Sequence, residues 1–236
     1  MTQQNEIDKL KYGIPFEYCE FADDIPSQNY ALGASYKRNK NKFIFEVSGK
    51  LFAAPKDLGS ITSDNFSQIP NRIQDLFGIT TDKEYFYEGA EVYRADIKKD
   101  LQLDKPVYGH INDIRKQLLK KSDKYIINSY GKLKYEHGLV VIPNTVSSKY
   151  RFSIYNKGIE IKRHKYRSSF HKQYYDLFDF QFLGQTQKIL RIELQLNNYK
   201  QIRRVFNLEK RGAPSVSSIF NCQNDVLRYE FTKLVA

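Results

Sequence analysis

Three short segments of the chain alternate apolar and polar residues with a period of two, a pattern that predicts half-buried strands. They are VYRADI (92–97), RFSIYNKGIEI (151–161) and LRIELQL (190–196). The polar positions that share a face are Arg94 and Asp96 in the first segment, Arg151, Ser153, Tyr155 and Lys157 in the second, and Arg191, Glu193 and Gln195 in the third. Because side chains alternate across a strand, the apolar residues between them are expected to enter a core.

The rest of the chain mixes strand and helix patterns. Two strands are predicted over 30–38 and 42–50, joined by a basic turn at 39–41, and two or three more over 124–144. Helices are predicted over 63–77, 107–121, 198–207 and 215–234, a turn at Gly158, and a further alternating segment over 175–183. This order predicts an α+β fold, with a largely antiparallel sheet and helices packed on one face.

The charge balance narrows the class of partner. The 236 residues include 38 Lys and Arg against 27 Asp and Glu, a net charge of +11. Such an excess favours a polyanionic partner, with nucleic acid ahead of a membrane surface. No apolar stretch is long enough to span a bilayer, so no membrane association is expected. Cys19 and Cys222 form no disulfide framework, and we interpret them as free thiols in a reducing cytoplasm.

Tyr155 is the candidate nucleophile, because a strand holds its backbone rigidly. Lys157 lies two residues further along, hence on the same predicted face. There its charge can polarise a phosphate or lower the pKa of the phenol. The alternative interpretation is a surface Tyr–Lys pair on an edge strand, since tyrosine is common in strands.

Asp96 and Glu193 are candidate ligands of a divalent metal, with Glu160 as a third. Mg²⁺ and Mn²⁺ prefer carboxylate oxygens, and acids from separate strands of one sheet can supply them. The alternative interpretation is a pair of cross-strand salt bridges, Arg94 with Glu193 and Arg191 with Asp96. No HxH or HExxH motif occurs, so a histidine-built metal site is not expected.

Basic residues interleave with aromatic ones in three clusters, at 36–42, 162–167 and 200–211. The residues expected to contact DNA are Lys37, Arg38, Lys40, Arg163, Lys165, Arg203 and Arg204. Lys and Arg at such positions neutralise phosphates and give salt-dependent binding, although each cluster can also be simply a solvated face. The chain contains no Walker A, GxGxxG or GxSxG motif, which leaves ATP hydrolysis, dinucleotide binding and serine esterase chemistry unsupported.

The ordered set EVYRADIKKDL, RFSIYNKGIEI and LRIELQLNN resembles the rolling-circle replication initiators, of the phage gene II/X type or the plasmid Rep_trans type. The resemblance covers about residues 90–207 and implies a DNA nickase and strand transferase. Tyr155 matches the nucleophile, Lys157 the lysine after it, and Asp96, Glu193 and Glu160 the acidic positions. Because an HxH motif is missing, the resemblance is to the initiators whose metal site is built from acids.

The implied reaction is metal-dependent nicking of a replication origin through a 5′-phosphotyrosine, with Mg²⁺ or Mn²⁺ as cofactor. The implied partners are origin DNA, as a duplex or hairpin with a single-stranded nick site, and the host helicase and polymerase in the bacterial cytoplasm. Residues 1–89 would then be a basic, DNA-recognising region and 90–236 the nicking core, unless both form one domain. The rival is a non-catalytic nucleic-acid-binding or virion-associated protein that retains the fold.

Overall fold

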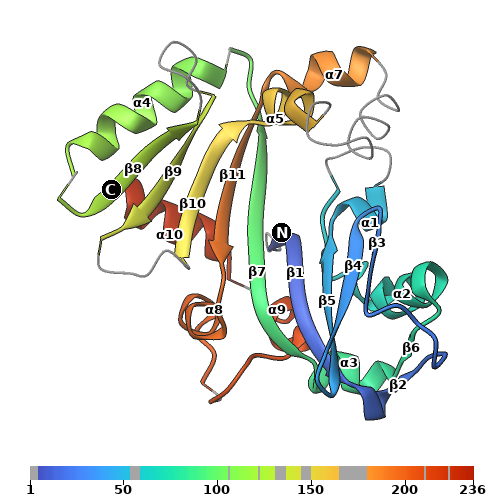
Figure 1. The fold of residues 1–236 in the computed structure, drawn as a ribbon. Coiled ribbons are helices and arrows are strands. Elements are labelled where there is room, and N and C mark those ends of the chain that lie inside the picture. The colour runs from blue at the N-terminus through green and yellow to red at the C-terminus, as the bar shows by residue number, and fades with distance from the viewer. Residues whose placement is uncertain are drawn as a thin grey trace. The chain divides into compact units, whose positions relative to one another are not determined.

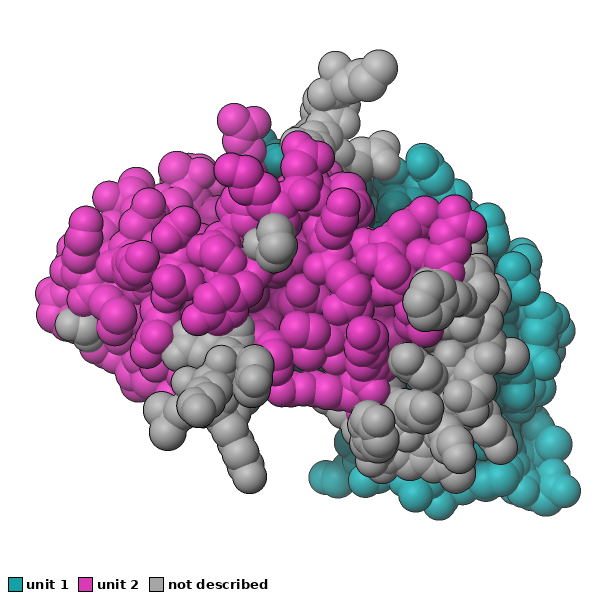
Figure 2. Space-filling model, turned by 90° about the horizontal axis from the view of Figure 1, so that it is seen from above, with its two compact units in different colours: residues 1–97, 196–226 teal, residues 98–195, 227–236 magenta. Residues whose placement is uncertain are grey.

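The chain divides into two compact units, which Figure 2 colours separately. Unit 1 comprises residues 1–97 and 196–226, and unit 2 comprises residues 98–195 and 227–236. The computed structural model describes residues 5–53, 59–105, 107–121, 123–130, 137–144, 150–164, 180–209, 211–222 and 224–236. The functional division between residues 1–89 and 90–236 stays a prediction.

Unit 1 is built on strands in the order β3-β4-β5-β1-β7 (Figure 1). Its elements are β1 (Glu6–Pro15), β2 (Cys19–Glu20), β3 (Gln28–Ala31), β4 (Ala34–Asn39), β5 (Lys42–Ser48), α1 (Lys50–Ala53), α2 (Ile69–Phe77), β6 (Thr80–Thr81), α3 (Lys83–Glu88), α8 (Tyr199–Phe206) and α9 (Val216–Phe220). Strand β7 (Glu91–Gln102) begins in unit 1 and ends in unit 2. The pairs β1–β5, β3–β4 and β4–β5 are antiparallel.

An aromatic core fills one face of these strands. Phe43, Phe45 and Val47 alternate with more exposed residues along β5 and are fully buried. Tyr12 of β1 stacks on Phe45, with ring centroids 5.4 Å apart. It also meets the ring of Phe86 in α3 edge-on. The alternation in β5 therefore sets which face the helices cover.

Helix α2 begins later than the sequence pattern predicts. The pattern over 63–77 predicts one helix, but the α-helix begins at Ile69 after a short 3-10 turn over Phe66–Gln68. Pro70 explains the difference, because proline fits the first turn of a helix and breaks its interior. The predicted end is confirmed: Gly78 has a φ of 68° and closes the helix in the left-handed conformation.

Unit 2 contains the remaining strands in the order β7-β11-β10-β9-β8. Its elements are α4 (Val107–Leu119), β8 (Tyr125–Tyr130), β9 (Gly138–Pro143), β10 (Tyr150–Asn156), α5 (Lys157–His164), α7 (Phe180–Thr186), β11 (Ile189–Leu196) and α10 (Val226–Val235), of which Leu196 and Val226 fall in unit 1. The pairs β8–β9 and β9–β10 are antiparallel. Helix α10 lies behind β10 in Figure 1, where Phe231 meets Phe152 edge-on.

The α+β fold class, with antiparallel strand pairs and helices covering a sheet face, is confirmed. Strand β1 and helix α3 are not predicted from the sequence, and the one helix predicted over 215–234 is two helices, α9 and α10. The strand pattern at 175–183 was wrong for residues 180–183, which belong to α7, while 175–179 lie outside the described residues. In the described part of the chain, no helix is long and apolar enough to cross a membrane.

Strand β10 ends earlier than the pattern over 151–161 predicts. Asn156 closes the strand, and its side-chain oxygen accepts a hydrogen bond from the backbone N–H of Ile159, 3.1 Å away. This is the geometry of a helix N-cap, so α5 begins at Lys157 in place of the predicted turn. The amide of Asn156 also donates to the backbone oxygen of Gln187, at 3.0 Å. One side chain thus joins the end of β10 to the segment that leads into β11.

Gly158 is expected to resist substitution. A Cβ at this position would lie 2.7 Å from the backbone nitrogen of Gln187, so Gly158→Ala should lower the free energy of unfolding by about 1–3 kcal/mol through overpacking. Gly109→Ala is the matched control, because Gly109 lies in α4 with no atom within 4 Å of the added Cβ, and it should stabilise by roughly 0.5–1 kcal/mol. Thermal or urea unfolding measures both. Equal effects would refute the close approach.

Candidate active site

Tyr155 and Glu193 meet on neighbouring strands of unit 2. The hydroxyl of Tyr155, on β10, donates a hydrogen bond to the carboxylate Oε1 of Glu193, on β11, over 2.9 Å. Tyr155 is half-buried and Glu193 is only 6% exposed. The structure therefore joins the predicted nucleophile to one of the predicted acids, as expected if the polar faces of the two strands coincide.

Two further side chains hold Glu193 in place. The amide of Gln195 donates to the second carboxylate oxygen of Glu193, at 3.0 Å. The Nε of Arg151 donates in turn to the amide oxygen of Gln195, at 2.5 Å. Because Glu193 and Gln195 are buried, a satisfied network of this kind fixes their orientation.

Strand β11 is buried along its whole length, although every second residue from Arg191 to Gln195 is polar. Arg191 makes a bidentate ion pair with Asp100 of β7, with both N–O distances at 2.6 Å. Lys98, also on β7, has its Nζ 3.5 Å from the carboxylate of Asp100. Burying a polar strand in this way requires partners on the adjacent strand, and β7 supplies them.

Lys98 and Asp100 lie beyond the strand that the sequence predicts, which ends at residue 97, whereas β7 continues to Gln102. The signal was present, because the polar positions Arg94, Asp96, Lys98 and Asp100 keep a period of two. Burial favours a raised pKa for Asp100, but the hydrogen bonds and charge of Arg191, with the charges of the nearby lysines, hold that pKa below its ordinary value.

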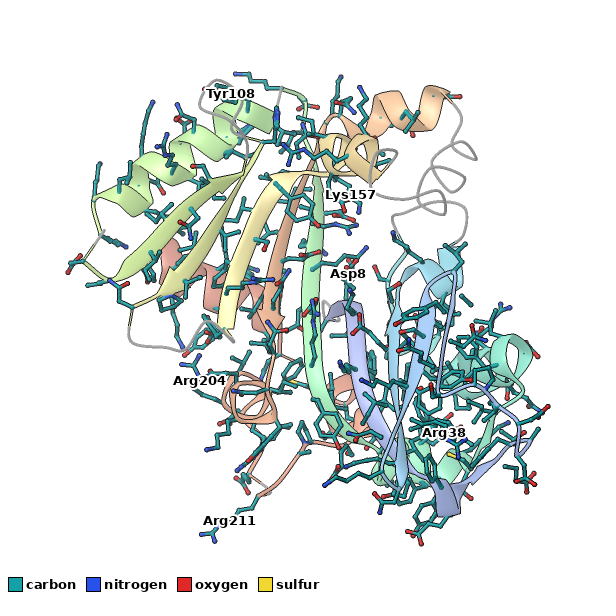
Figure 3. The ribbon with its side chains drawn as sticks, in the orientation of Figure 1. Asp8, Arg38, Tyr108, Lys157, Arg204 and Arg211 are labelled. Carbon is teal, nitrogen blue, oxygen red and sulfur yellow. The ribbon has the colours of Figure 1, made fainter. Side chains whose placement is uncertain are left out.

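Lys157 does not share a strand face with Tyr155, so that prediction was wrong. It is the first residue of α5, buried at the point where β10 passes into the helix (Figure 3). Its Nζ forms an ion pair with Glu160 one turn further along, at 2.8 Å. The predicted cation therefore sits close in sequence to Tyr155, but it is positioned by a helix.

Asp96 belongs to unit 1, and Glu193 to unit 2. The carboxylate of Asp96 accepts two hydrogen bonds from Arg94 on the same strand, one from Nε at 2.9 Å and one from Nη2 at 2.5 Å. Burial raises the pKa of Asp96 above its ordinary value, although Arg94 opposes the shift. The structure shows one ion pair along β7, Arg94 with Asp96, and one between strands, Arg191 with Asp100.

The metal site stays a prediction. Within the described residues, no group of three or more potential ligands is assembled. The carboxylate of Asp96 accepts from Arg94, that of Glu160 pairs with Lys157, and that of Glu193 accepts from Tyr155 and Gln195. Each side chain still offers the carboxylate oxygens that Mg²⁺ and Mn²⁺ prefer, but an ion must compete with these donors.

The predicted DNA-binding residues of the β4–β5 hairpin lie in unit 1. Lys37 and Lys40 are exposed, and Lys40 adopts a positive φ of 51° in the turn. The guanidinium of Arg38 lies over the rings of Phe16 and Phe21, 5.3 and 5.5 Å from their centroids. Arg38 is therefore partly committed to cation–π packing.

The remaining basic residues lie elsewhere. Arg204 is exposed on α8 (Figure 3). Arg203 is half-buried on the same helix, and its Nε has no hydrogen-bond partner among the described residues. Arg163 is exposed on α5 of unit 2, and Lys165 lies outside the described residues. That all these residues contact DNA stays a prediction.

The competing tyrosines are less suitable nucleophiles. Tyr150 is on β10 but out of phase with Tyr155, and it is 4% exposed. Its hydroxyl donates to Glu230 of α10, at 2.5 Å, on the face covered by that helix. Tyr166 lies outside the described residues.

The ion pair of Asp100 is expected to make stability depend on pH. The pKa of Asp100 is lower in the folded state, so its stabilisation is present at neutral pH and is lost as the pH falls below about 4. Asp100→Asn should lower the free energy of unfolding at pH 7 by about 3 kcal/mol, the lower end for breaking a buried pair. Denaturant unfolding from pH 7 to pH 3 should show this gap narrowing. Asp113→Asn, an exposed carboxylate on α4, is the control and should have little effect at any pH.

Comparisons with known proteins leave the family open. No protein-family model matches the chain, and no curated protein matches it. Among solved structures, that of a rolling circle replication initiator protein from Geobacillus stearothermophilus aligns over 95% of this chain and 97% of that chain, with 13% identity and a TM-score of 0.43. A similarity of this size establishes neither the activity nor the site residues of this chain.

Proposed function

We propose that the protein is a rolling-circle replication initiator that nicks origin DNA and transfers the strand through Tyr155. The observation that carries the proposal is the hydrogen bond from the Tyr155 hydroxyl to the buried carboxylate of Glu193. A nucleophile beside a base, with the base oriented by a third group, is the general arrangement of covalent catalysis. Here Gln195 is the third group. The order of the three sequence motifs supports the same reaction.

In the proposed step, the oxygen of Tyr155 attacks the phosphorus of a scissile phosphodiester. The phenolic proton passes to Glu193, which already accepts it in a hydrogen bond. The bond between phosphorus and the 3′ oxygen breaks, and the leaving oxygen takes up a proton. The products are a 5′-phosphotyrosine and a free 3′-OH, and because the covalent link conserves the phosphodiester's energy, no ATP is required.

Positive charge must offset the charge that develops on the phosphate. Lys157 is proposed to supply part of it from the start of α5. A divalent ion, Mg²⁺ or Mn²⁺, is proposed to be held by Glu193 and Glu160 of unit 2, where it would supply further charge for the phosphate oxygens, and Asp96 of unit 1 stays a predicted ligand from the sequence. The competing hydrogen bonds of these carboxylates favour weak binding of the ion in the absence of DNA.

Origin DNA is the proposed partner, in a bacterial cytoplasm with host helicase and polymerase acting afterwards. The net charge of +11 and the exposed cations of the β4–β5 hairpin and α8 support this partner. The rival proposal is a nucleic-acid-binding or virion-associated protein that does not cleave. In that case the Tyr155–Glu193 hydrogen bond only stabilises the sheet.

Tyr155→Phe should abolish covalent capture of DNA while fold and DNA binding survive, because only the hydroxyl is lost. Glu193→Gln keeps the shape of the acceptor but removes the base, so its rate of adduct formation should fall by roughly 10²–10⁴. The measurement is a denaturing gel of protein on end-labelled single-stranded origin DNA, with Mg²⁺ or Mn²⁺ present.

Tyr150→Phe is the matched control, because Tyr150 is on the same strand with its hydroxyl on the opposite face. It should form the adduct normally. An adduct from Tyr155→Phe would assign the nucleophile to another residue, and no adduct from any form of the protein would favour the non-catalytic rival.

Arg204→Ala should weaken DNA binding across all sequences. If Arg204 neutralises one phosphate, the slope of log K against log salt concentration should flatten by about 0.9. Fluorescence anisotropy on duplex DNA over a range of salt concentrations measures the slope. Lys116→Ala, an exposed cation on α4 of unit 2, is the comparison for general charge loss. Equal slopes for Arg204→Ala and the wild type would remove α8 from the interface.

A further inference from the structure

Three buried cations of unit 2 lie on β7, on β11 and at the start of α5, and the charge of each helps to lower the pKa of Asp100. We call Lys98, Lys157 and Arg191 the cation cluster. Their side chains are 0%, 3% and 2% exposed. Removing three positive charges from water is strongly unfavourable unless counter-charges accompany them.

The carboxylates that pair with the cation cluster are more exposed than the cations themselves. Asp100 holds Arg191 and approaches Lys98, and Glu160 holds Lys157. The side chains of Asp100 and Glu160 are 19% and 24% exposed, well above the cations beneath them. These ion pairs place the carboxylates of Asp100 and Glu160 against the three cations.

The contact between Arg191 and Asp100 has the geometry of a phosphate contact. Nε and an Nη of the guanidinium each face one carboxylate oxygen at 2.6 Å. The planar fork of arginine binds carboxylate and phosphate in the same bidentate way. The carboxylate of Asp100 thus occupies the place that two oxygens of a phosphate would take.

The cluster lies beside the candidate nucleophile. Arg191 is two residues from Glu193 on β11, about 6.6 Å along the strand. Both side chains are on the polar face, where Glu193 meets the Tyr155 hydroxyl. Lys157 follows Tyr155 by two residues, and Asn156, which caps α5, lies between them in the chain.

We propose that the cation cluster is a phosphate-binding site in which Asp100 and Glu160 are exchangeable counter-ions. A phosphodiester of the DNA strand, next to the one attacked by Tyr155, displaces the two carboxylates from Arg191 and Lys157. Without DNA the carboxylates keep the buried cations compensated and exclude other anions. The inference rests on the proposed function only for the identity of the anion.

The test is the effect of inorganic phosphate on the thermal stability of the full chain, at constant ionic strength set with chloride. A ligand that binds only the folded state raises its stability as RT ln(1 + [L]/Kd). Asp100→Asn and Glu160→Gln keep side-chain size and remove a counter-ion. Each variant should bind phosphate about tenfold more tightly than the wild type, which is a gain of about 1.4 kcal/mol in binding free energy.

Two controls make the result specific. Asp113→Asn removes a carboxylate from the exposed side of α4 and should respond to phosphate as the wild type does. Adding Lys98→Met to Glu160→Gln should abolish the gain in phosphate affinity. If Asp100→Asn fails to fold in chloride, Glu160→Gln alone decides, because its carboxylate is the more exposed of the two. An unchanged phosphate response in Glu160→Gln would overturn the proposal.

A thymidine dinucleotide with one phosphodiester separates the possible anions. Stabilisation of Glu160→Gln by the dinucleotide supports a DNA phosphate as the ligand. A response to inorganic phosphate alone would overturn the assignment to DNA. None of these measurements requires cleavage, so their failure is distinguishable from the failure of Tyr155→Phe to lose the covalent adduct.

Discussion

The buried carboxylate of Glu193 constrains the side chains around it in unit 2. A carboxylate that is 6% exposed cannot remain without donors, because an unpaired buried charge is severely destabilising. Tyr155 and Gln195 supply those donors from β10 and from β11 itself. The same requirement fixes the register in which the two strands meet, since a slip of one residue would turn every polar side chain into the apolar core.

Strand β11 shows how unit 2 accommodates this polarity. All eight of its residues are buried, yet Arg191, Glu193 and Gln195 all face polar partners. A strand that served only packing would be apolar on both faces. Buried ion pairs often add no net stability over apolar packing, and this is the physical argument behind the functional role proposed for these charges.

The positions of Lys157 and Glu160 follow from the Asn156 cap. If the strand had continued past Asn156, Lys157 would lie on the same face as Tyr155, and the chain would turn at Gly158. Instead the cap starts a helix, the tight contact between Gly158 and Gln187 holds it against the chain before β11, and the lysine is buried. The chemistry available beside Tyr155 thus depends on a side-chain hydrogen bond made by an asparagine.

The sequence by itself determined the α+β class, the two-residue period of β7, β10 and β11, and the placement of Tyr155 and Glu193 on the polar faces of their own strands. Strand alternation is a local property, so it can be read from the chain. Only the tertiary structure decided that Asp100 is the partner of Arg191, because ion pairs between residues 91 positions apart depend on strand order and register. The burial of Lys98 and Lys157 was also decided by the tertiary structure. Burial depends on which elements cover a residue, and the local sequence around that residue does not specify them.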